Sequence, residues 1–217
     1  MRLAIALATC AACPAQAQDY IESVGALNDS DFYRLVACAA PVDALCTKPF
    51  YKWDKAALTV GIVQRDAPFL GGKIKRADAA VVRALQHLNA VNMGITLRHG
   101  TGTPDIAIYL LDTARGEKIS SKQGNPLNGH TMANAVTALD VDGGLIKGAS
   151  IALSRTMSIR QFESVMLEEI TQALGLVTDI LNPFYRSRSI LSQNADNSLK
   201  VLGNQDKIAL IRHYPPN

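Results

Sequence analysis

The 217-residue sequence predicts one α+β domain, in which a twisted, mixed β-sheet is backed by helices. Short segments where apolar and polar residues alternate predict the strands, and longer segments with apolar residues three or four apart predict the helices. Their order is strand, helix, two strands, loop, strand pair, helix, an irregular part and a final helix. The length and the 48% hydrophobic content are sufficient for a domain with a hydrophobic core.

The N-terminus is predicted to be a secretory signal peptide that covers residues 1–17. Arg2 supplies the positive start, residues 3–12 are apolar, and Ala15-Gln16-Ala17 has the small-x-small pattern of a cleavage site. The mature chain is therefore expected to begin at Gln18 and to be exported, either to the periplasm or out of the cell. We predict no transmembrane segment in the mature chain, because no later stretch is apolar enough to span a bilayer.

Residues 18–52 are predicted to form a short helical segment held by a disulfide bond. Two of the four cysteines leave with the signal peptide, so Cys38 and Cys46 remain. An even number of cysteines in an exported protein favours one disulfide, which would stabilise the fold by about 2–3 kcal/mol through closure of a short loop. The alternative is a pair of free, buried thiols.

The first part of the main domain, which is predicted to span residues 53–217, contains three strands and one helix. The helix is expected to follow a turn at Gly71-Gly72, to be capped by Asp78 and to end at Gly94. Alternation of apolar and polar residues predicts strands at residues 58–63, 95–99 and 105–112.

A long polar loop is predicted at residues 113–128, where glycine and proline recur. Loops of this kind often line a cleft. A strand pair follows at residues 135–139 and 145–153, joined through residues 140–144. This acidic connection resembles the start of a calcium loop but lacks the later ligands, so a plain turn is predicted.

The next helix, which we call the signature helix, is expected to begin near Ser158, with Gln161 completing a capping box. One carboxylate, Glu169, falls within its apolar face, and such a group needs a partner or a function. Glu168 and Gln172 lie four residues apart on the adjoining flank. The chain is predicted to be irregular from 183 to 197 and to form a final helix at 205–213. The apolar face comprises Phe162, Val165, Met166, Ile170, Ala173 and Leu176.

The signature helix has the residue spacing of a zinc-peptidase motif but lacks the histidines that would bind zinc. In the motif H-E-x-x-H, two histidines one turn apart bind zinc and the glutamate between them is the general base. Here Glu168 and Gln172 occupy the histidine positions, Glu169 keeps the glutamate position, and Leu174-Gly175-Leu176 follows as an apolar-Gly-apolar exit.

On these residues the chain resembles the zincin superfamily, and its element order is nearest to the metzincins and matrixins. More closely, it resembles the proteobacterial exported domain-of-unknown-function family 2927, whose hallmark E-E-x-x-Q-x-L-G-L-x-N-D is read here at residues 168–179. Thr178 departs from the family, which has asparagine there. The resemblance covers roughly residues 53–216 and implies a zincin-like fold in an exported protein. The family's S-I-F-N-D-D element and closing helix resemble residues 189–194 and 206–216.

The resemblance to metzincins would place three histidines at Glu168, Gln172 and Thr178. Glu168 could be one metal ligand, but the neutral oxygens of Gln172 and Thr178 are weak ligands for zinc. We therefore expect a degenerate metal site with no cofactor. Glu169 is the candidate catalytic residue, a general base with a pKa raised by burial. The alternative is an inherited polar group that is satisfied by backbone, Gln172 or Thr171.

Two further residues are candidates for ligand binding. Asp179, together with Glu168, could bind a cation or a basic group, and the alternative is that both are solvated carboxylates. His130 lies near a loop that could border a cleft, and the alternative is a surface or hydrogen-bonded histidine. The net charge of +3 without a basic cluster predicts no nucleic-acid partner. Serine-nucleophile and nucleotide-binding motifs are not found.

The sequence therefore predicts an exported pseudoenzyme that binds a peptide or a cell-envelope component beside an edge strand of the former substrate cleft. The first alternative is an active metal-dependent peptidase that uses Glu168, ligands from elsewhere in the chain, and Glu169 as base. The second is a structural envelope module without a ligand. Fold analogy alone does not choose among the three.

Overall fold

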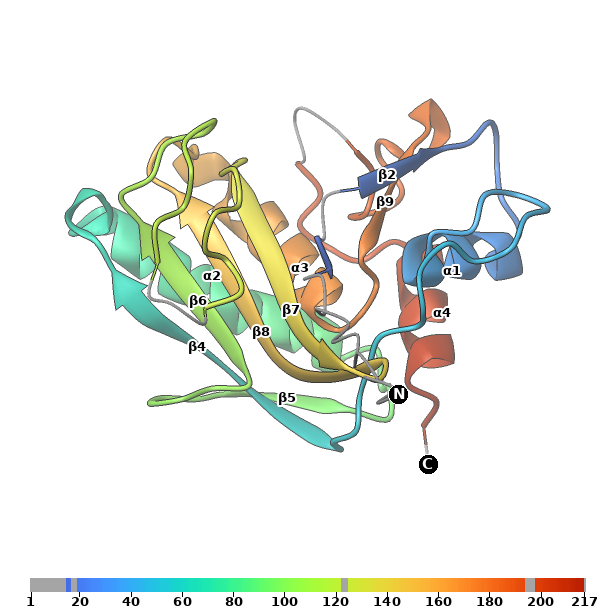
Figure 1. Cartoon of the computed structure of the whole chain (residues 1–217), viewed down its shortest axis with the longest axis horizontal. Helices are drawn as coiled ribbons and strands as arrows, with labels where there is room; N and C mark the ends of the chain where they lie inside the picture. The colour runs from blue at the N-terminus through green and yellow to red at the C-terminus, as the bar shows by residue number, and fades with distance from the viewer. Residues whose placement is uncertain (1–14, 17–18, 122–124, 194–197, 217) are drawn as a thin grey trace, which may run out of the picture.

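The computed structural model describes residues 15–16, 19–121, 125–193 and 198–216, and these residues form the predicted α+β fold. The predicted signal peptide, residues 1–17, lies outside the described residues except at 15–16. In the described part, a mixed sheet has the strand order β1-β7-β8-β6-β4-β5, with β3 beside β8 (Figure 1). Its strands are β1 (Ala15–Gln16), β3 (Lys52–Trp53), β4 (Ala57–Arg65), β5 (Thr96–His99), β6 (Ile106–Leu111), β7 (Ala135–Asp142) and β8 (Leu145–Ser154).

The five strands predicted from alternation, β4 to β8, are all present. Strands β5, β4, β6 and β8 run parallel to one another, whereas β7 runs antiparallel to β8. The turn between β7 and β8 is tighter than predicted, because β7 continues to Asp142 and only Gly143 and Gly144 connect the strands. Both glycines have positive φ, which suits a two-residue hairpin turn.

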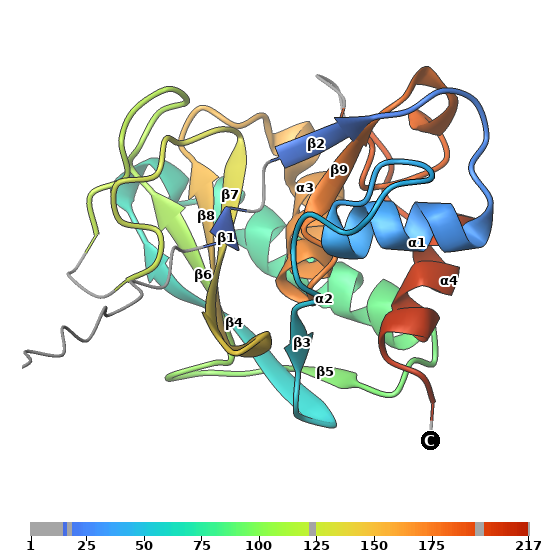
Figure 2. The same cartoon turned by 45° about the vertical axis from the view of Figure 1, so that its right-hand side comes forward.

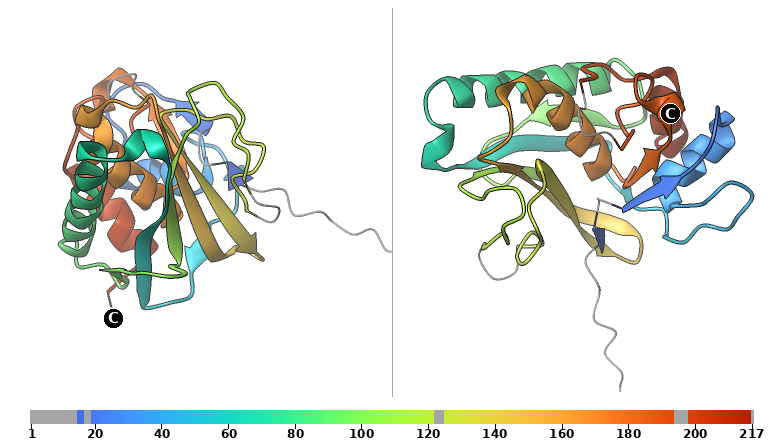
Figure 3. Two further views of the ribbon diagram at one scale, coloured as in Figure 1. Left: turned by 90° about the vertical axis from the view of Figure 1, so that its left-hand side faces the viewer. Right: turned by 90° about the horizontal axis from the view of Figure 1, so that it is seen from above.

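Two helices, α2 (Gly72–Asn89) and α3 (Phe162–Ala173), pack against each other on one face of the sheet. The polar loop before β7 covers the opposite face, as the right-hand view of Figure 3 makes visible. The hydrophobic core fills the space between the helices and the sheet. The predicted polar loop therefore lies on the opposite face of the sheet from α3.

Helix α2 begins six residues before the predicted cap at Asp78. This earlier start brings Ala77 into the core, and Asp78 instead binds Arg65 at 3.0 Å on the surface. The helix ends at Asn89, before Gly94. The Asn89 amide exchanges two hydrogen bonds with the backbone of Leu97, at 2.8 and 2.9 Å, and so joins the helix end to β5.

The signature helix starts with a 3₁₀ turn, Ile159–Gln161, followed by α3. The predicted capping box with Gln161 does not form, because the Ser158 hydroxyl accepts from the backbone N–H of Arg160. At the other end of α3, Gly175 has a φ of 104°, and a Cβ there would overlap the carbonyl oxygen of Tyr51. The glycine of the apolar-Gly-apolar exit is therefore required by backbone geometry.

The last carbonyl groups of α3 receive side-chain donors from distant parts of the chain. Trp53 Nε1 donates to the carbonyl of Ala173 at 2.8 Å, and the Tyr214 hydroxyl donates to the carbonyl of Leu174 at 2.6 Å. Carbonyl groups at a helix end have no partner within the helix, so these two bonds fix the end of α3.

A two-stranded parallel sheet of β2 (Asp19–Glu22) and β9 (Thr178–Leu181) was not predicted from the sequence. It lies beside α1 (Asp29–Cys38), and α1 packs in turn against α4 (Asn204–His213), as Figure 2 shows. The predicted disulfide between Cys38 and Cys46 is present. Segment 19–52 shares the main hydrophobic core through α1 and is therefore packed onto the domain.

The final helix, α4, begins within one residue of its predicted start. Asp206 in its first turn is buried and accepts hydrogen bonds from the Ser189 hydroxyl at 2.6 Å and the backbone N–H of Ile190 at 3.0 Å. These bonds tie the segment after β9 to the last helix. Among the residues that the structure describes, no helix has the length and apolar character to cross a membrane.

Candidate functional site

A buried pair of carboxyl groups, Glu169 on α3 and Asp179 on β9, forms the center of the candidate site. Each residue is only 5% exposed. Helix α3 passes behind β7, and the turn at Gly175 leads from the helix into β9 (Figure 1). Burial of Glu169 agrees with its place in the apolar face of the signature helix. Asp179, by contrast, is a buried carboxyl group and not a solvated one.

Glu169 is bound to the sheet. Its carboxylate accepts a hydrogen bond of 2.5 Å from the hydroxyl of Thr137, which lies in the middle of β7. The proposed alternative partners are engaged elsewhere: the Thr171 hydroxyl donates to the carbonyl of Leu167 at 2.7 Å, and the Gln172 amide donates to Asp179. Thr137 was not identified as a site residue from the sequence. It is the one polar residue among residues 135–139, which were predicted to form this strand.

Asp179 is held by the former metal-ligand position. Gln172 Nε2 donates to Asp179 Oδ1 at 2.9 Å, so the side chain at the second histidine position of the motif is engaged with a carboxyl group. Lys48, which was also missed from the sequence, contributes a favourable charge interaction with Asp179. The site therefore joins α3, β7 and β9, with a basic side chain from the N-terminal segment.

Burial dominates the electrostatics of this pair. It raises the pKa of Glu169 to about 7, against the opposing effect of the Thr137 hydrogen bond. Burial, and then repulsion from Glu169, hold the pKa of Asp179 well above its usual range, although Gln172 and Lys48 act in the other direction. At neutral pH the pair therefore retains protons that two solvated carboxyl groups would have lost.

The residues at the three histidine positions do not form a zinc site. Glu168 is half-buried on the flank of α3, Gln172 is directed at Asp179, and Thr178 is fully buried in β9. Successive residues of a strand point to opposite sides, so Thr178 and Asp179 do not face the same side. In the described ranges, no group of three histidine, cysteine, aspartate or glutamate side chains could hold a metal ion. This donor set does not fit zinc, which prefers three strong nitrogen, sulfur or carboxylate ligands.

Two buried polar atoms of this region lack hydrogen-bond partners. They are Gln172 Oε1 and Thr178 Oγ1, and neither is bonded to any atom of the described residues. Buried polar atoms usually have a partner, because leaving one unsatisfied costs about 1–3 kcal/mol. The site is therefore polar and incompletely satisfied, at the positions where the resemblance implied metal ligands.

His130 is not part of this site. It is buried in the loop before β7, and that loop packs on the sheet through Ile119 and Leu127 against Val136. Thr137, the next residue of β7, points to the other face, toward Glu169. Burial, with the charge of Lys118 as a smaller cause, lowers the pKa of His130.

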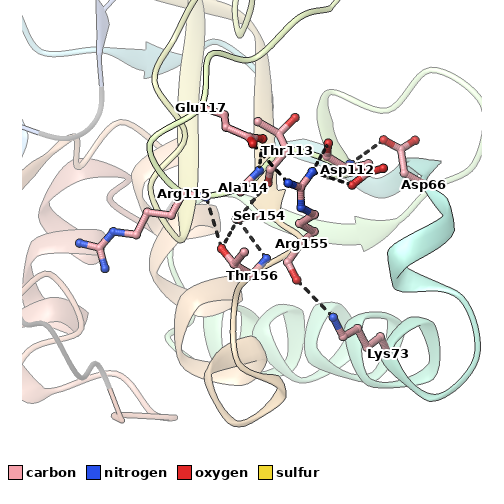
Figure 4. A network of polar contacts seen from close by, with 10 residues as sticks. All are labelled: Asp66, Lys73, Asp112, Thr113, Ala114, Arg115, Glu117, Ser154, Arg155 and Thr156. Carbon is pink, nitrogen blue, oxygen red and sulfur yellow. Dashed lines mark hydrogen bonds and ion pairs between the residues drawn. The ribbon is translucent and has the colours of Figure 1, made fainter.

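A second polar network lies where three parallel strands end (Figure 4). Arg155, just after β8, binds Asp112 at 2.9 Å and Glu117 at 3.2 Å. Lys73 donates to the backbone carbonyl of Arg155 at 3.2 Å, and Asp66 accepts from the backbone N–H of Asp112 at 2.7 Å. The side chains of Arg155, Asp112 and Glu117 are all exposed, and the network fixes the start of the polar loop.

No protein-family model matches this chain, and no curated protein matches it at a significant level. The class of protein is therefore inferred from the fold and the geometry of the site.

Proposed function

We propose that this protein is an exported, zincin-like pseudo-peptidase, periplasmic or secreted, that binds an extended peptide or envelope-protein segment without cleaving it. The order of strands and helices on which the resemblance rests supports this class. The observation that carries the proposal is the internal hydrogen bonding of the site. Glu169 is bonded to Thr137, and Gln172 is bonded to Asp179.

The positions that would perform catalysis are engaged inside the protein. A general base must reach the water or substrate proton that it removes, whereas Glu169 is only 5% exposed and faces β7. Activation of water by a metal would require three suitable ligands, and Gln172 and Thr178 supply neutral oxygens. Binding is therefore better supported than hydrolysis.

The edge of β7 supports peptide binding. Ala15–Gln16 pairs with it as a short antiparallel strand, with Ala15 opposite Leu139 and Gln16 opposite Ala138 (Figure 2). Both residues belong to the predicted signal peptide. After cleavage behind Ala17, the same edge would be free to accept a strand from another chain. Strand addition of this kind gains its affinity from backbone hydrogen bonds.

The test compares residues 18–217 with the full chain, using a synthetic peptide of residues 11–17 that carries Cys13→Ser. Hydrogen exchange would be followed at the backbone amides of Ala138 and Leu139. We expect the peptide to slow exchange in the shorter chain only, because the full chain already carries a strand on this edge. Equal exchange with and without peptide would contradict the binding part of the proposal.

An active hydrolase is the second candidate, and one observation favours it. The pKa of Glu169, raised by burial to about 7, suits a general base at neutral pH. The mature chain would be incubated with a mixed peptide library, and the products would be examined by mass spectrometry. We expect no cleavage. Cleavage that is lost in Glu169→Gln, together with stoichiometric metal that is lost in Glu168→Ala, would establish the hydrolase instead.

A further inference from the structure

A pocket of about 400 Å³ lies at the N-terminal end of α3, away from the buried carboxyl pair. Arg76 of α2, Arg160 of the 3₁₀ turn and Lys200 of the segment before α4 form its basic walls. Glu163, in the first turn of α3, is the one acidic residue among the described residues that line it. Because Glu163 and Glu169 are six residues apart, they are separated by about 9 Å along the helix axis.

The carboxylate of Glu163 is already neutralised. Glu163 binds Arg83 at 2.7 Å and Lys200 at 3.3 Å. The guanidinium groups of Arg76 and Arg160 are exposed and form no hydrogen bond or ion pair with any residue that the structure describes. Two cationic groups that each carry several donors therefore remain available at one pocket.

The end of α3 adds positive potential to the same place. The helix is twelve residues long and continues directly from the 3₁₀ turn Ile159–Gln161, where the Ser158 hydroxyl accepts from the backbone N–H of Arg160. The N-terminus of a helix carries a partial positive charge that favours anions within its first turn. The helix end and the two arginines thus act in the same direction.

We propose that this pocket binds a phosphate monoester carried on a small organic group. Arginine presents its donors in a planar fork that matches the oxygens of a phosphate group, and two such forks favour phosphate over a neutral ligand. Ile159, which is 42% exposed, supplies an apolar wall for the organic part. A volume of about 400 Å³ lies within the range of small-molecule sites. This pocket is independent of the proposed peptide-binding edge.

The test measures binding to the full chain by isothermal titration calorimetry, with glycerol 3-phosphate and inorganic phosphate as probes. The variant carries Arg76→Gln and Arg160→Gln. The matched control is Arg98→Gln, which changes another exposed arginine, on β5, without a partner among the described residues. We expect glycerol 3-phosphate to bind, to bind at least tenfold more weakly to the double variant, and to be unaffected by the control.

Three further measurements complete the test. Binding to vesicles that contain phosphatidic acid tests whether the phosphate group is recognised on a lipid. If the protein binds these vesicles through Arg76 and Arg160 but does not bind glycerol 3-phosphate, the phosphate monoester that the pocket recognises is a lipid headgroup. Unfolding curves establish that the variants are folded, and the single variant Arg160→Lys should keep part of the affinity. Absence of binding by every probe, or an equal loss in Arg98→Gln, would overturn the proposal.

Discussion

The exposed network around Arg155 and the buried pair of Glu169 and Asp179 both join several elements through carboxyl groups, but they differ in solvent and in charge balance. On the surface, Asp112 and Glu117 flank one arginine, and their side chains are about half exposed. In the core, two acids lie near each other and their hydrogen-bond donors, Thr137 and Gln172, are neutral.

This difference decides what each network contributes. Exposed ion pairs are screened by water and salt and add little to stability. A buried carboxyl group avoids the cost of carrying a charge in the core by keeping its proton, so its contribution depends on pH. Of these two networks, the buried pair of Glu169 and Asp179 is thus the one expected to couple the stability of the fold to protonation near neutral pH.

The largest effect is expected at Gly175, in the turn between α3, which carries Glu169, and β9, which carries Asp179. Gly175→Ala would force a Cβ into the carbonyl oxygen of Tyr51 at a φ of 104°, so the turn between α3 and β9 would have to move away from Tyr51. We expect a loss of at least about 3 kcal/mol in the free energy of unfolding, measured by urea denaturation.

Gly143→Ala is the matched control for this prediction. Gly143 also has a positive φ, 57°, but a Cβ there would have no heavy atom within 4 Å. The cost should therefore be limited to backbone strain, roughly 1–2 kcal/mol. Equal losses in the two variants would mean that the close approach to Tyr51 does not constrain the turn.

The second prediction concerns pH. A carboxyl group whose pKa is higher in the folded than in the unfolded state favours folding at low pH, and this contribution is lost as the pH rises through the folded value. For Glu169 the window runs from its ordinary 4.5 to about 7. Raising the pH from 5 to 8 should therefore remove roughly 2–4 kcal/mol of the contribution of this pair to the free energy of unfolding, measured by urea denaturation as the difference between the parent and a variant without the two carboxyl groups. The comparison with the variant is needed because burial lowers the pKa of His213 to about 4, and this group acts in the opposite direction.

The variant that combines Glu169→Gln with Asp179→Asn isolates this effect. Both substitutions keep the size of the side chain and remove the titrating group, so the loss of stability that this pair causes as the pH rises should be absent from the variant. The slope is the informative quantity, because the new amides alter the absolute stability as well. A variant slope equal to that of the parent would assign the pH dependence to other groups.

A smaller effect is expected from Thr137→Val, which removes the donor to Glu169 while keeping the shape of the side chain. The ionised carboxylate loses more than the protonated one, so we expect a cost of about 1–3 kcal/mol at pH 8 and less at pH 5. Thr171→Val is the control, because its hydroxyl donates to a backbone carbonyl. Its cost should not change with pH, and parallel changes in both variants would contradict the prediction.

The part of the fold that the sequence predicted is the part whose periodicity is local. Strands β4 to β8 follow from alternation, and α3 and α4 from helical spacing and terminal residues. Sheet β2–β9 could not be predicted in the same way, because it pairs segments that lie far apart in the chain, with Asp19 opposite Thr178. The start of α2 was misplaced because burial of Ala77 outweighs the capping preference of Asp78.

The candidate site, like the fold, could be predicted only where the signal in the sequence is local. Burial of Glu169 followed from its position among apolar residues at helical spacing. The partner on β7, the burial of Asp179 and the position of His130 on the opposite face depend on how helix and strands pack. A single sequence therefore identified the unusual carboxylate, whereas the groups that determine its protonation had to come from the structure.

The smallest effect is expected on the surface, at Arg155→Gln. The substitution removes both ion pairs of this side chain, but Asp112 and Glu117 remain hydrated, and the entropy lost in fixing a long side chain is regained. We expect a shift in the urea midpoint that is smaller than that of Gly143→Ala and that shrinks further in about 1 M salt, where charges are screened within roughly 3 Å. Arg98→Gln, which has no partner to lose among the described residues, gives the baseline. A loss at Arg155 that exceeds the loss at Thr137, or that persists in high salt, would mean that the exposed network supports the fold as strongly as the buried one.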